Sequence, residues 1–568
     1  MKFILLLFCF SISTFFSQQS YEDVNFRSPI GIPLLLSGNF AELRSNHFHT
    51  GLDIKTKGTS GYRVYAIDSG YISRINVSHW GYGLAVYITH PNGYTSVYGH
   101  LSKFSKHVAQ YVRAAQYQQE TETLTLYPDS LDLPVKKGEV FALSGNSGSS
   151  MGPHLHFEVR ETVSEKPVNP LLFNFDVLDN ISPSIFNIKL YPLANGAVNE
   201  SSKEQLFKVL KVGKEFSLSH KIKAFGEIGF GIHTIDKLNG AGNVCGIYSI
   251  ELFIDDSLYF FQQMEKLDFS TNRYINTHKD YQEFKKNRRS IHKSFISDNN
   301  ELGIYKKIIN KGRFVIAHNK SYKVKYRVKD VSGNSSSVSF EIQGDSLQKK
   351  FAATKTNNVQ LNAVQGKDSI VTQNLKVYFD AKTMYNPVDK SVVVGDYPNS
   401  LSDLYAVQHK DIPVHKKFVL QIKLKDSLKG CDNKAVIVGV SDDKRKVSSK
   451  GGVCQDGWMV ASLKSFGNYT VLLDTIAPVV NFINVYKGKT IKGLGTINLK
   501  ISDNLSGIKK YNVFIDDKWI LANYYPRAAA LKIKSSEWAY LSKGPHKLKA
   551  VVEDDRGNIT TKSIAINY

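Results

Sequence analysis

Short runs in which hydrophobic and polar residues alternate cover much of this 568-residue chain. Residues 84–90 alternate in this way, turn at Pro91-Asn92-Gly93, and alternate again over residues 94–100. A period of two is typical of strands with one buried face, and Asn-Gly between two such runs indicates a β-hairpin. Runs of the same kind recur far along the chain, for example at residues 375–379 and 418–422. The pattern predicts a mainly β protein.

Two stretches in the second part of the chain repeat one another. Asp179 and Pro183 bracket a segment that resembles the one between Asp474 and Pro478, and residues 248–256 resemble residues 511–517. Each copy ends with the motif Asp-x-x-Gly-Asn, at residues 330–334 and 554–558, followed by an alternating run. The residues of this motif favour turns. We therefore expect two related β-sandwich domains, similar to immunoglobulin-like modules. Their acidic turns lack the ligand spacing of a calcium loop.

These patterns divide the chain into segments. The expected division is a signal peptide (1–17), a first β domain (21–175) with an insert (105–134), a β-sandwich domain (176–344), a linker (345–367), a further β domain (368–473) and a last β-sandwich domain (474–568). The 176–344 domain also carries a basic, helix-prone insert at about residues 266–307.

The beginning of the chain predicts export. Lys2 precedes an apolar run, residues 3–16, which has the length and flanks of a signal peptide and is short for a membrane span. The rest of the chain has no run of eighteen apolar residues, so we expect no membrane span. Export to the periplasm, the cell surface or the medium favours disulfides, and Cys431 and Cys454 are the nearer pair, with Cys245 left over.

Charge is distributed unevenly along the chain. The formal net charge is +22, but residues 21–175 contain thirteen Lys/Arg and thirteen Asp/Glu, so nearly all of the surplus lies after residue 175. In an exported protein this asymmetry points to anionic envelope polymers as partners rather than nucleic acid. Lysine-rich strand faces exposed to solvent are the alternative explanation.

Four residues in the first domain form a candidate metal site. His154 and His156 are two apart in an extended run, so both project from one face, and His49 lies four residues before Asp53. If one histidine of the pair binds the metal and the other stands beside it, two imidazoles and one carboxylate leave a coordination position open, which is typical of catalytic rather than structural zinc. By the same period of two, Ser96, Tyr98 and His100 share a face. Spare histidines beside the metal can act as base and oxyanion donor in hydrolysis.

These residues lie in sequence motifs that resemble those of a known family. His49-x-x-x-Asp53, Tyr98-Gly-His100-Leu and Gly152-Pro-His154-Leu-His156-Phe-Glu look like motifs of the lysostaphin-like (LytM-type) zinc endopeptidases, which cut peptide cross-links of peptidoglycan. Arg44, Gly138-Glu139 and the loop at 144–148 also fit, in the same order, and the resemblance covers residues 30–162.

The resemblance implies a fold, a cofactor and roles. It implies a duplicated-hybrid-motif β-sheet domain, one Zn²⁺ held by His49, Asp53 and His156, and His100 and His154 as the catalytic pair, with His154 as general base. The substrate would be peptidoglycan peptides. The insert at 105–134 departs from the family pattern, and long inserts beside a site are often lids or groove walls.

Several alternatives remain open. His47-x-His49 is itself a His-x-His pair, so His47 competes as a ligand. Glu158 shares the face of His156 and is either a supporting residue or an exposed strand glutamate. Tyr98 either packs or donates a hydrogen bond near the site. At the level of the whole protein, the alternatives to a peptidase are a cell-wall-binding or hydrolase-activating LytM-like protein and a surface adhesin.

Overall fold

The computed structural model describes residues 21–212, 215–218, 221–352, 359–425 and 433–568. The expected signal peptide and Cys431 lie outside these residues. The disulfide between Cys431 and Cys454 therefore stays a prediction. Cys245 is buried and forms no disulfide with any described residue. Among the described residues, no helix is long and apolar enough to cross a membrane.

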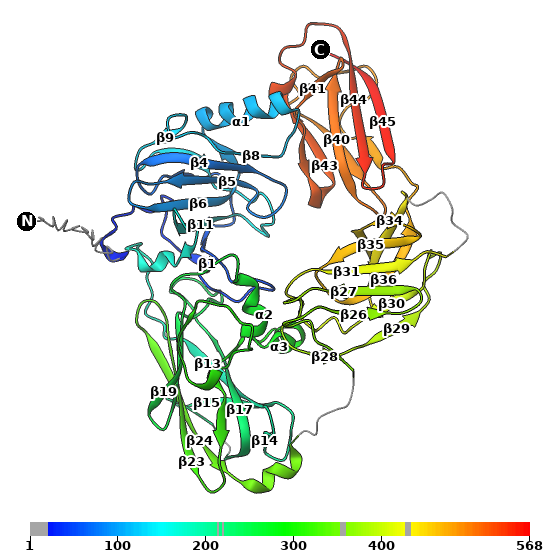
Figure 1. The fold of residues 1–568 in the computed structure, drawn as a ribbon. Coiled ribbons are helices and arrows are strands. Elements are labelled where there is room, and N and C mark those ends of the chain that lie inside the picture. Colours follow the sequence, from blue (N-terminus) through cyan, green and yellow to red (C-terminus); the bar gives the residue numbers. More distant parts are fainter. Residues whose placement is uncertain (1–20, 213–214, 219–220, 353–358, 426–432) are drawn as a thin grey trace, which may run out of the picture.

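The first domain contains two antiparallel sheets around one core (Figure 1). The larger sheet runs in the order β1, β2, β11, β6, β5, β4, β8, with β12 beside β11 and β9 beside β4. Its strands are β1 (Leu36–Gly38), β2 (Leu52–Lys55), β4 (Gly70–Val77), β5 (Leu84–Thr89), β6 (Tyr94–Leu101), β8 (Leu124–Leu126), β9 (Pro134–Val135), β11 (His154–Glu161) and β12 (Pro167–Val168). The smaller sheet consists of β3 (Arg63–Tyr65), β10 (Val140–Leu143) and β7 (Lys103–Phe104). The predicted hairpin is formed by β5 and β6.

The second domain is a twelve-stranded sheet that folds back on itself. It runs from β13 (Ser184–Pro192) to β24 (Ser335–Gly344), and β17 (Ile222–Ile235) pairs with both β13 and β24. The helix-prone insert forms the short helices α2 (Ile275–His278) and α3 (Tyr281–Asn287) with β20 (Ile291–Lys293) and β21 (Tyr305–Ile308). The sheet encloses its own apolar core.

The third and fourth domains each pack two sheets around a core. In the third domain one sheet is β26 (Asp368–Val371), β27 (Leu375–Phe379), β31 (Phe418–Lys423), β35 (Trp458–Leu463) and β34 (Val453–Gln455). The other is β29 (Val392–Gly395), β30 (Leu404–Val407), β36 (Gly467–Leu473), β32 (Ala435–Val440) and β33 (Val447–Gly451). The structure differs from the sequence expectation at its start, because β25 (Gln360–Leu361) pairs with β28 (Val388–Asp389) and Leu361 and Ala363 lie in the core. Part of the expected linker therefore belongs to this domain.

Some strand pairings of the second domain recur in the fourth, in agreement with the sequence repeat. In the second domain β13 follows the Asp-x-x-x-Pro segment and pairs with β17. In the fourth domain β37 (Val479–Phe482) follows the equivalent segment and pairs with β39 (Thr496–Ser502). The Asp-x-x-Gly-Asn turns join β23 (Ser321–Lys329) to β24 and β44 (Pro545–Asp554) to β45 (Ile559–Asn567). The mainly β architecture predicted from the alternating pattern is confirmed.

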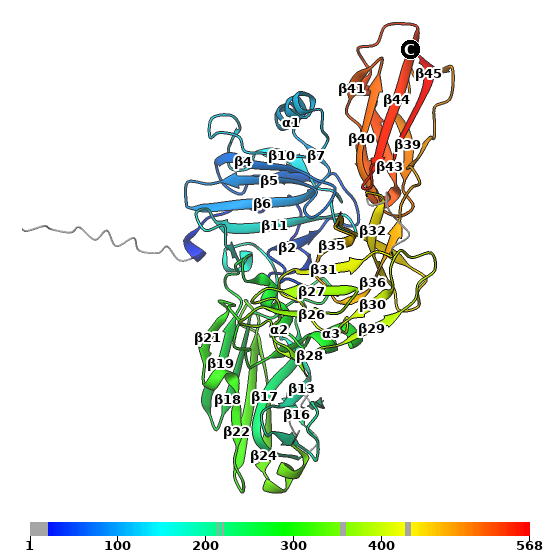
Figure 2. The ribbon, with the colours of Figure 1, turned by 45° about the vertical axis from the view of Figure 1, so that its right-hand side comes forward.

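The four domains follow a curved path, and the last returns to the first (Figures 1 and 2). The insert of the first domain forms α1 (Lys106–Gln119) and β8. Both elements of the insert face the fourth domain.

Candidate metal centre

The register of β2 against β11 brings the predicted ligands together. His156 lies directly opposite Asp53 across the two strands, and His154 lies on the same face two residues earlier. The intervening residues of β11 point into the core and are fully buried, which holds the strand in place: Leu155, Phe157 and Val159. Gly51 permits the close approach, because a Cβ there would lie 2.3 Å from the backbone oxygen of Phe157.

Three ligand atoms converge at this point. The distance from His49 Nε2 to Asp53 Oδ1 is 3.1 Å, from His156 Nδ1 to Asp53 Oδ1 is 2.9 Å, and from His49 Nε2 to His156 Nδ1 is 3.1 Å. Ligands about 2.0–2.1 Å from a tetrahedral zinc ion are separated from one another by about 3.3 Å. The triangle therefore has nearly the dimensions that such an ion needs, and all three residues are buried.

The hydrogen bonds of the two imidazoles orient their lone pairs toward this point. His49 Nδ1 lies 2.8 Å from the carbonyl oxygen of Asn39, which can only accept a hydrogen bond, so Nδ1 carries the proton. His156 Nε2 lies 2.8 Å from Glu158 Oε1, which fixes its proton in the same way. In the neutral tautomers, His49 Nε2 and His156 Nδ1 are therefore acceptors. Such outer partners are characteristic of histidine metal ligands.

Glu158 is fully buried and anchors His156. Its Oε1 also accepts hydrogen bonds from Thr50 Oγ1 at 2.6 Å and Tyr82 OH at 2.5 Å, and its Oε2 accepts one from Arg160 Nε at 2.7 Å. Burial disfavours the charge, but Arg160 and His156 hold the pKa of this carboxyl well below its usual range. The structure thus favours the supporting role for Glu158 over that of an exposed strand glutamate.

The site attracts positive charge. Burial opposes ionisation of Asp53, yet the proximity of His49 and hydrogen bonds from His154 and His156 lower the pKa of Asp53 well below its ordinary value. Burial also opposes charge on His156, yet hydrogen bonds to Asp53 and Glu158 raise its pKa to about 9. The second oxygen of Asp53 accepts a hydrogen bond from Arg44 at 2.5 Å. Two imidazoles and a carboxylate in this setting fit a divalent zinc-like cation.

His100 and His154 lie beside the three ligands. Their ring centroids are 4.7 Å apart, and His154 Nε2 lies 3.4 Å from Asp53 Oδ1. His154 Nδ1 lies 2.8 Å from the carbonyl oxygen of Gly152, and His100 Nδ1 lies 2.9 Å from that of Ser147. Because these oxygens only accept, the neutral rings are protonated at Nδ1 and each has an Nε2 that can take a proton.

The expectation that Ser96, Tyr98 and His100 share a face is wrong for His100. Tyr98 points into the core, where it packs against Phe141 and Phe157 and its hydroxyl accepts a hydrogen bond from the backbone of Ile67. His100 has a φ of 58°, in the left-handed region, which turns its side chain out of the regular alternation. Such strain often occurs at functional sites. Tyr98 is therefore a packing residue, which is one of the two roles that the sequence left open for it.

His47 is not part of the cluster. Its side chain is exposed, and the group of convergent ligand atoms contains His49 instead. Partial desolvation of its imidazole and the nearby charges of Arg44 and His49 lower the pKa of His47 to about 4.

The second domain supports the segment that carries His49, which the sequence did not indicate. Asn272 Oδ1 accepts a hydrogen bond from the backbone nitrogen of Phe48 at 2.7 Å, and the buried ammonium of Lys279 donates to the carbonyl oxygens of Arg44 and Ser45. An apolar cluster joins the first two domains here and also includes one residue of the third domain, Tyr385. Its members are Phe40, Ala41, Leu43, Phe48, Met264, Leu267, Tyr274, Ile275, Leu302, Ile304 and Tyr385. The metal centre thus rests on parts of the chain more than 200 residues apart.

Replacement of Asn272 by Ala is expected to weaken metal binding without touching a ligand. The change leaves the buried nitrogen of Phe48 without a partner, which costs about 1–3 kcal/mol, and frees the neighbouring His49. We expect a metal affinity about 10-fold lower, as for other supporting residues, measured by competition with a chelator. Asn287→Ala, at an exposed position of the same insert, is the matched control. Equal affinities in both variants would contradict the supporting role.

The insert at residues 105–134 contacts the fourth domain. The carboxylate of Glu122 accepts hydrogen bonds from the backbone nitrogen of Tyr524 at 2.9 Å and from the hydroxyl of Tyr511, and Arg113 of α1 pairs with Glu537. Beside the site, Arg527 donates to the carbonyl oxygen of Ser150, whose hydroxyl lies 3.2 Å from His154 Nδ1. Through Glu122 and Arg113, the insert binds the fourth domain to the first.

Comparison with known proteins gives two family matches. Residues 47–117 match the model of Peptidase family M23, and residues 360–474 match the model of a Zu5-like domain. The first match includes three of the five predicted site residues, His49, Asp53 and His100. The second match begins where β25 begins, in agreement with the earlier start of the third domain.

Two curated relatives and a solved structure align with the first domain. Over 129 residues the chain is 35% identical to the DD-carboxypeptidase/endopeptidase Mpg of Neisseria meningitidis, covering 23% of each protein. Over 123 residues it is 35% identical to an uncharacterized metalloprotease of Haemophilus influenzae, covering 22% of this chain and 20% of the relative. The catalytic domain of lysostaphin from Staphylococcus simulans is 25% identical, with 24% and 86% coverage and a TM-score of 0.18. The matched part spans less than a quarter of the length of these curated relatives.

Proposed function

We propose that this protein, which contains a peptidase domain of family M23, is an exported zinc metalloendopeptidase that hydrolyses peptide cross-bridges of peptidoglycan. The observation that carries the proposal is the convergence of His49 Nε2, Asp53 Oδ1 and His156 Nδ1 within about 3 Å of one another. Two further histidines, His100 and His154, lie beside these three ligands. A purely structural metal site does not need them.

The chemistry divides among five residues. His49, Asp53 and His156 would hold one zinc ion, which supplies a Lewis acid for a substrate carbonyl and for water. His154 would take a proton from the attacking water at Nε2, since its Nδ1–H donates to the carbonyl of Gly152. His100 is held by its own bond to Ser147, and burial with the neighbouring His156 and His154 lowers its pKa to about 3. It would donate a hydrogen bond to the developing oxyanion only after its Nε2 takes up a proton from solvent. The side chain of His154 remains partly exposed, so its ring can be reached from solvent.

Peptidoglycan peptides are proposed as the substrate on two grounds. The aligned Neisseria relative is named as a DD-carboxypeptidase/endopeptidase. The family whose motifs this chain resembles cuts peptidoglycan cross-links. Such a substrate requires export, which the apolar run after Lys2 also favours.

A digest of purified peptidoglycan tests the proposal. Intact sacculi are incubated with the full-length, zinc-loaded protein, and the soluble muropeptides are resolved by mass spectrometry. Endopeptidase activity converts cross-linked dimers into monomers, whereas carboxypeptidase activity shortens the stem peptide by one residue. Fully metallated protein that releases neither kind of product would favour a cell-wall-binding or hydrolase-activating role instead.

The basic part of the chain is proposed to hold the protein at an anionic envelope polymer. The surplus positive charge lies after residue 175, and attraction between exposed charges is screened over about 8–10 Å near physiological ionic strength. Sedimentation of the full-length protein with sacculi should therefore fall several-fold between low salt and about 0.5 M salt. Binding that does not depend on salt would mean that these lysines are only a solvated surface.

A further inference from the structure

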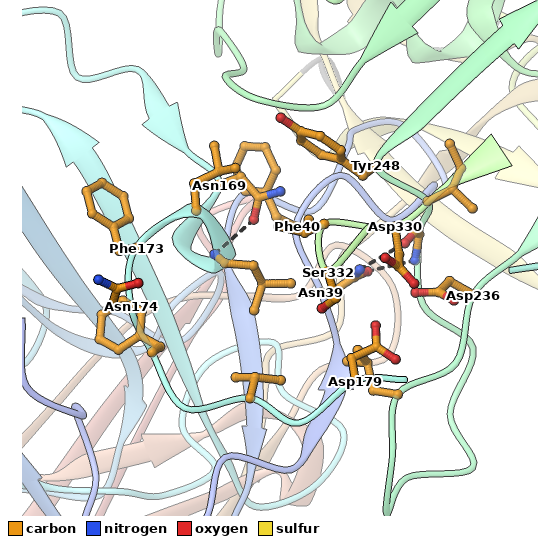
Figure 3. A pocket seen from close by; sticks show the side chains of 18 residues that line it. Asn39, Phe40, Asn169, Phe173, Asn174, Asp179, Asp236, Tyr248, Asp330 and Ser332 are labelled. Atoms are coloured by element: carbon orange, nitrogen blue, oxygen red, sulfur yellow. Dashed lines mark hydrogen bonds between the residues drawn. The ribbon is translucent and has the colours of Figure 1, made fainter. Parts of the chain in front are cut away.

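A cluster of three aspartates lies outside the metal centre, at the entry to the second domain. Asp179, Asp236 and Asp330 each place a carboxylate oxygen within 4.8 Å of the others. Figure 3 shows these side chains pointing toward one another along a cavity of about 240 Å³. Residues of the first domain line the same cavity, among them Asn39 and Asn169.

The fourth domain contains the same cluster, built from the equivalent residues of the repeat. Its members are Asp474, Asp503 and Asp554, again within 4.8 Å of one another. Asp474 begins the Asp-x-x-x-Pro segment as Asp179 does, and Asp503 follows β39 as Asp236 follows β17.

Hydrogen bonds around the third aspartate are the same in both copies. In the second domain, Asp330 accepts bonds from the backbone and side-chain nitrogens of Asn334 at 2.9 and 2.8 Å, and Asn334 also donates to the carbonyl oxygen of Asp179. In the fourth domain, Asp554, Asn558 and Asp474 make the same three bonds. The turn thus holds its aspartate against the entry segment in each domain.

Each cluster contains a buried carboxylate oxygen without a partner. Asp236 and Asp474 are each 1% exposed, and Oδ1 of each has no hydrogen-bond partner among the described residues. Oδ1 of Asp503 is likewise buried and without a partner. No described lysine, arginine or histidine forms an ion pair with any of the six aspartates: Asp179, Asp236, Asp330, Asp474, Asp503 and Asp554.

Unpaired buried carboxylates are unfavourable unless a cation neutralises them. Burial, with the nearby charges of Asp179 and Asp330, raises the pKa of Asp236 to about 8. Oxygen-only ligand sets suit hard cations. Ca²⁺ accepts six to eight oxygens in flexible geometry, whereas Mg²⁺ requires a near-ideal octahedron, and three carboxylates from separate chain segments are compatible with the former.

We propose that each of the two aspartate clusters binds one calcium ion, at Asp179, Asp236 and Asp330 in the second domain and at Asp474, Asp503 and Asp554 in the fourth. In each domain the ion connects the entry segment, the end of an early strand and the turn before the last strand. Backbone oxygens and water complete the coordination, for which the cavity at the first cluster has ample room.

Both clusters lie at a junction with the preceding domain. The cavity of the first is lined by residues of the first and second domains. At the second, Asp474 directly follows the last strand of the third domain, and Arg556 of the neighbouring turn donates to the carbonyl oxygens of Ala435 and Gly452, each at 2.9 Å. Calcium bound there stiffens the two junctions and so fixes the orientation of successive domains.

The stoichiometry of calcium binding tests the proposal. Full-length protein is freed of calcium on a chelating resin, given one equivalent of zinc, and titrated with ⁴⁵Ca²⁺ in equilibrium dialysis. We expect two ions per chain with a Kd on the order of 10⁻⁴ M, as for extracellular calcium modules. Excess Mg²⁺ is the competitor. No binding at 5 mM calcium, or equal binding of magnesium, overturns the assignment to calcium.

Single substitutions locate the ions. Asp236→Asn and Asp503→Asn should each bind one calcium ion, and the double variant should bind none. Asp517→Asn, at an exposed residue of the fourth domain that pairs with Lys549, should still bind two. Retention of both ions in the double variant overturns the assignment of the ligands.

Thermal unfolding separates a binding site from a merely structural cluster. Calcium at 5 mM should raise the unfolding temperature of the wild type by about 5 °C and that of the double variant not at all. Without calcium, the double variant should be at least as stable as the wild type, because it removes repulsion between carboxylates. A variant that is less stable than the wild type with and without calcium, by the same amount, contradicts the proposal.

Discussion

The His154→Ala variant is expected to lose hydrolysis while keeping its metal. His154 Nε2 lies 3.4 Å from Asp53 Oδ1, so it reaches the reacting water, but the three convergent ligand atoms come from other residues. Loss of one positioned base typically lowers the rate by about 10²–10⁴-fold. Muropeptide release should therefore fall to background, while metal analysis shows one zinc per chain.

Two further variants complete this experiment. His100→Ala should behave nearly as His154→Ala, because His100 is the other histidine of the pair and loss of an oxyanion donor costs about 10²–10³-fold. His107→Ala removes an exposed imidazole from α1 and should retain full activity. If His154→Ala loses its zinc in proportion to its activity, His154 is a ligand and the assignment of roles is wrong.

The His49→Ala variant is expected to lose the metal itself. His49 supplies one corner of the ligand triangle, and no other described residue lies in its place within the group of convergent atoms. Removal of a direct ligand should lower metal affinity by more than the 10–100-fold that supporting residues cost. The protein as purified should then contain well below one zinc per chain and show no activity.

His47→Ala is the matched control for this change. It removes a histidine two residues away whose side chain is exposed, so zinc content and activity should stay at the wild-type level. Thermal unfolding in the presence of a chelator shows whether His49→Ala also disturbs the fold through the lost bond to Asn39. Full zinc in His49→Ala together with loss in His47→Ala would make His47 the ligand.

Some of the site could be read from local periodicity. His154, His156 and Glu158 lie on one face of β11 because side chains alternate along a strand, and the structure has them so. His100 shows the limit of the same reasoning. Its φ of 58° breaks the alternation, which a strict period of two does not predict.

The local sequence pattern likewise could not predict that Glu158 is buried. A strand glutamate next to a ligand can be solvated or can be enclosed, and the sequence offered both alternatives. Four donors from separate elements, namely Thr50, Tyr82, His156 and Arg160, enclose it here. Whether such donors meet depends on strand register, which is a property of the whole sheet.

The sequence by itself determined the mainly β class, the family motifs with their ligand types, and the repeat in the second and fourth domains. These features follow from short-range rules, since alternation, turn residues and ligand spacing act within a few residues. Only the tertiary structure decided that Asn272 and Lys279 support the His49 segment, that the insert at 105–134 docks the last domain, and that two sets of three aspartates converge. Each of these contacts joins residues far apart in the chain, and their proximity depends on how whole domains pack, which no local pattern encodes.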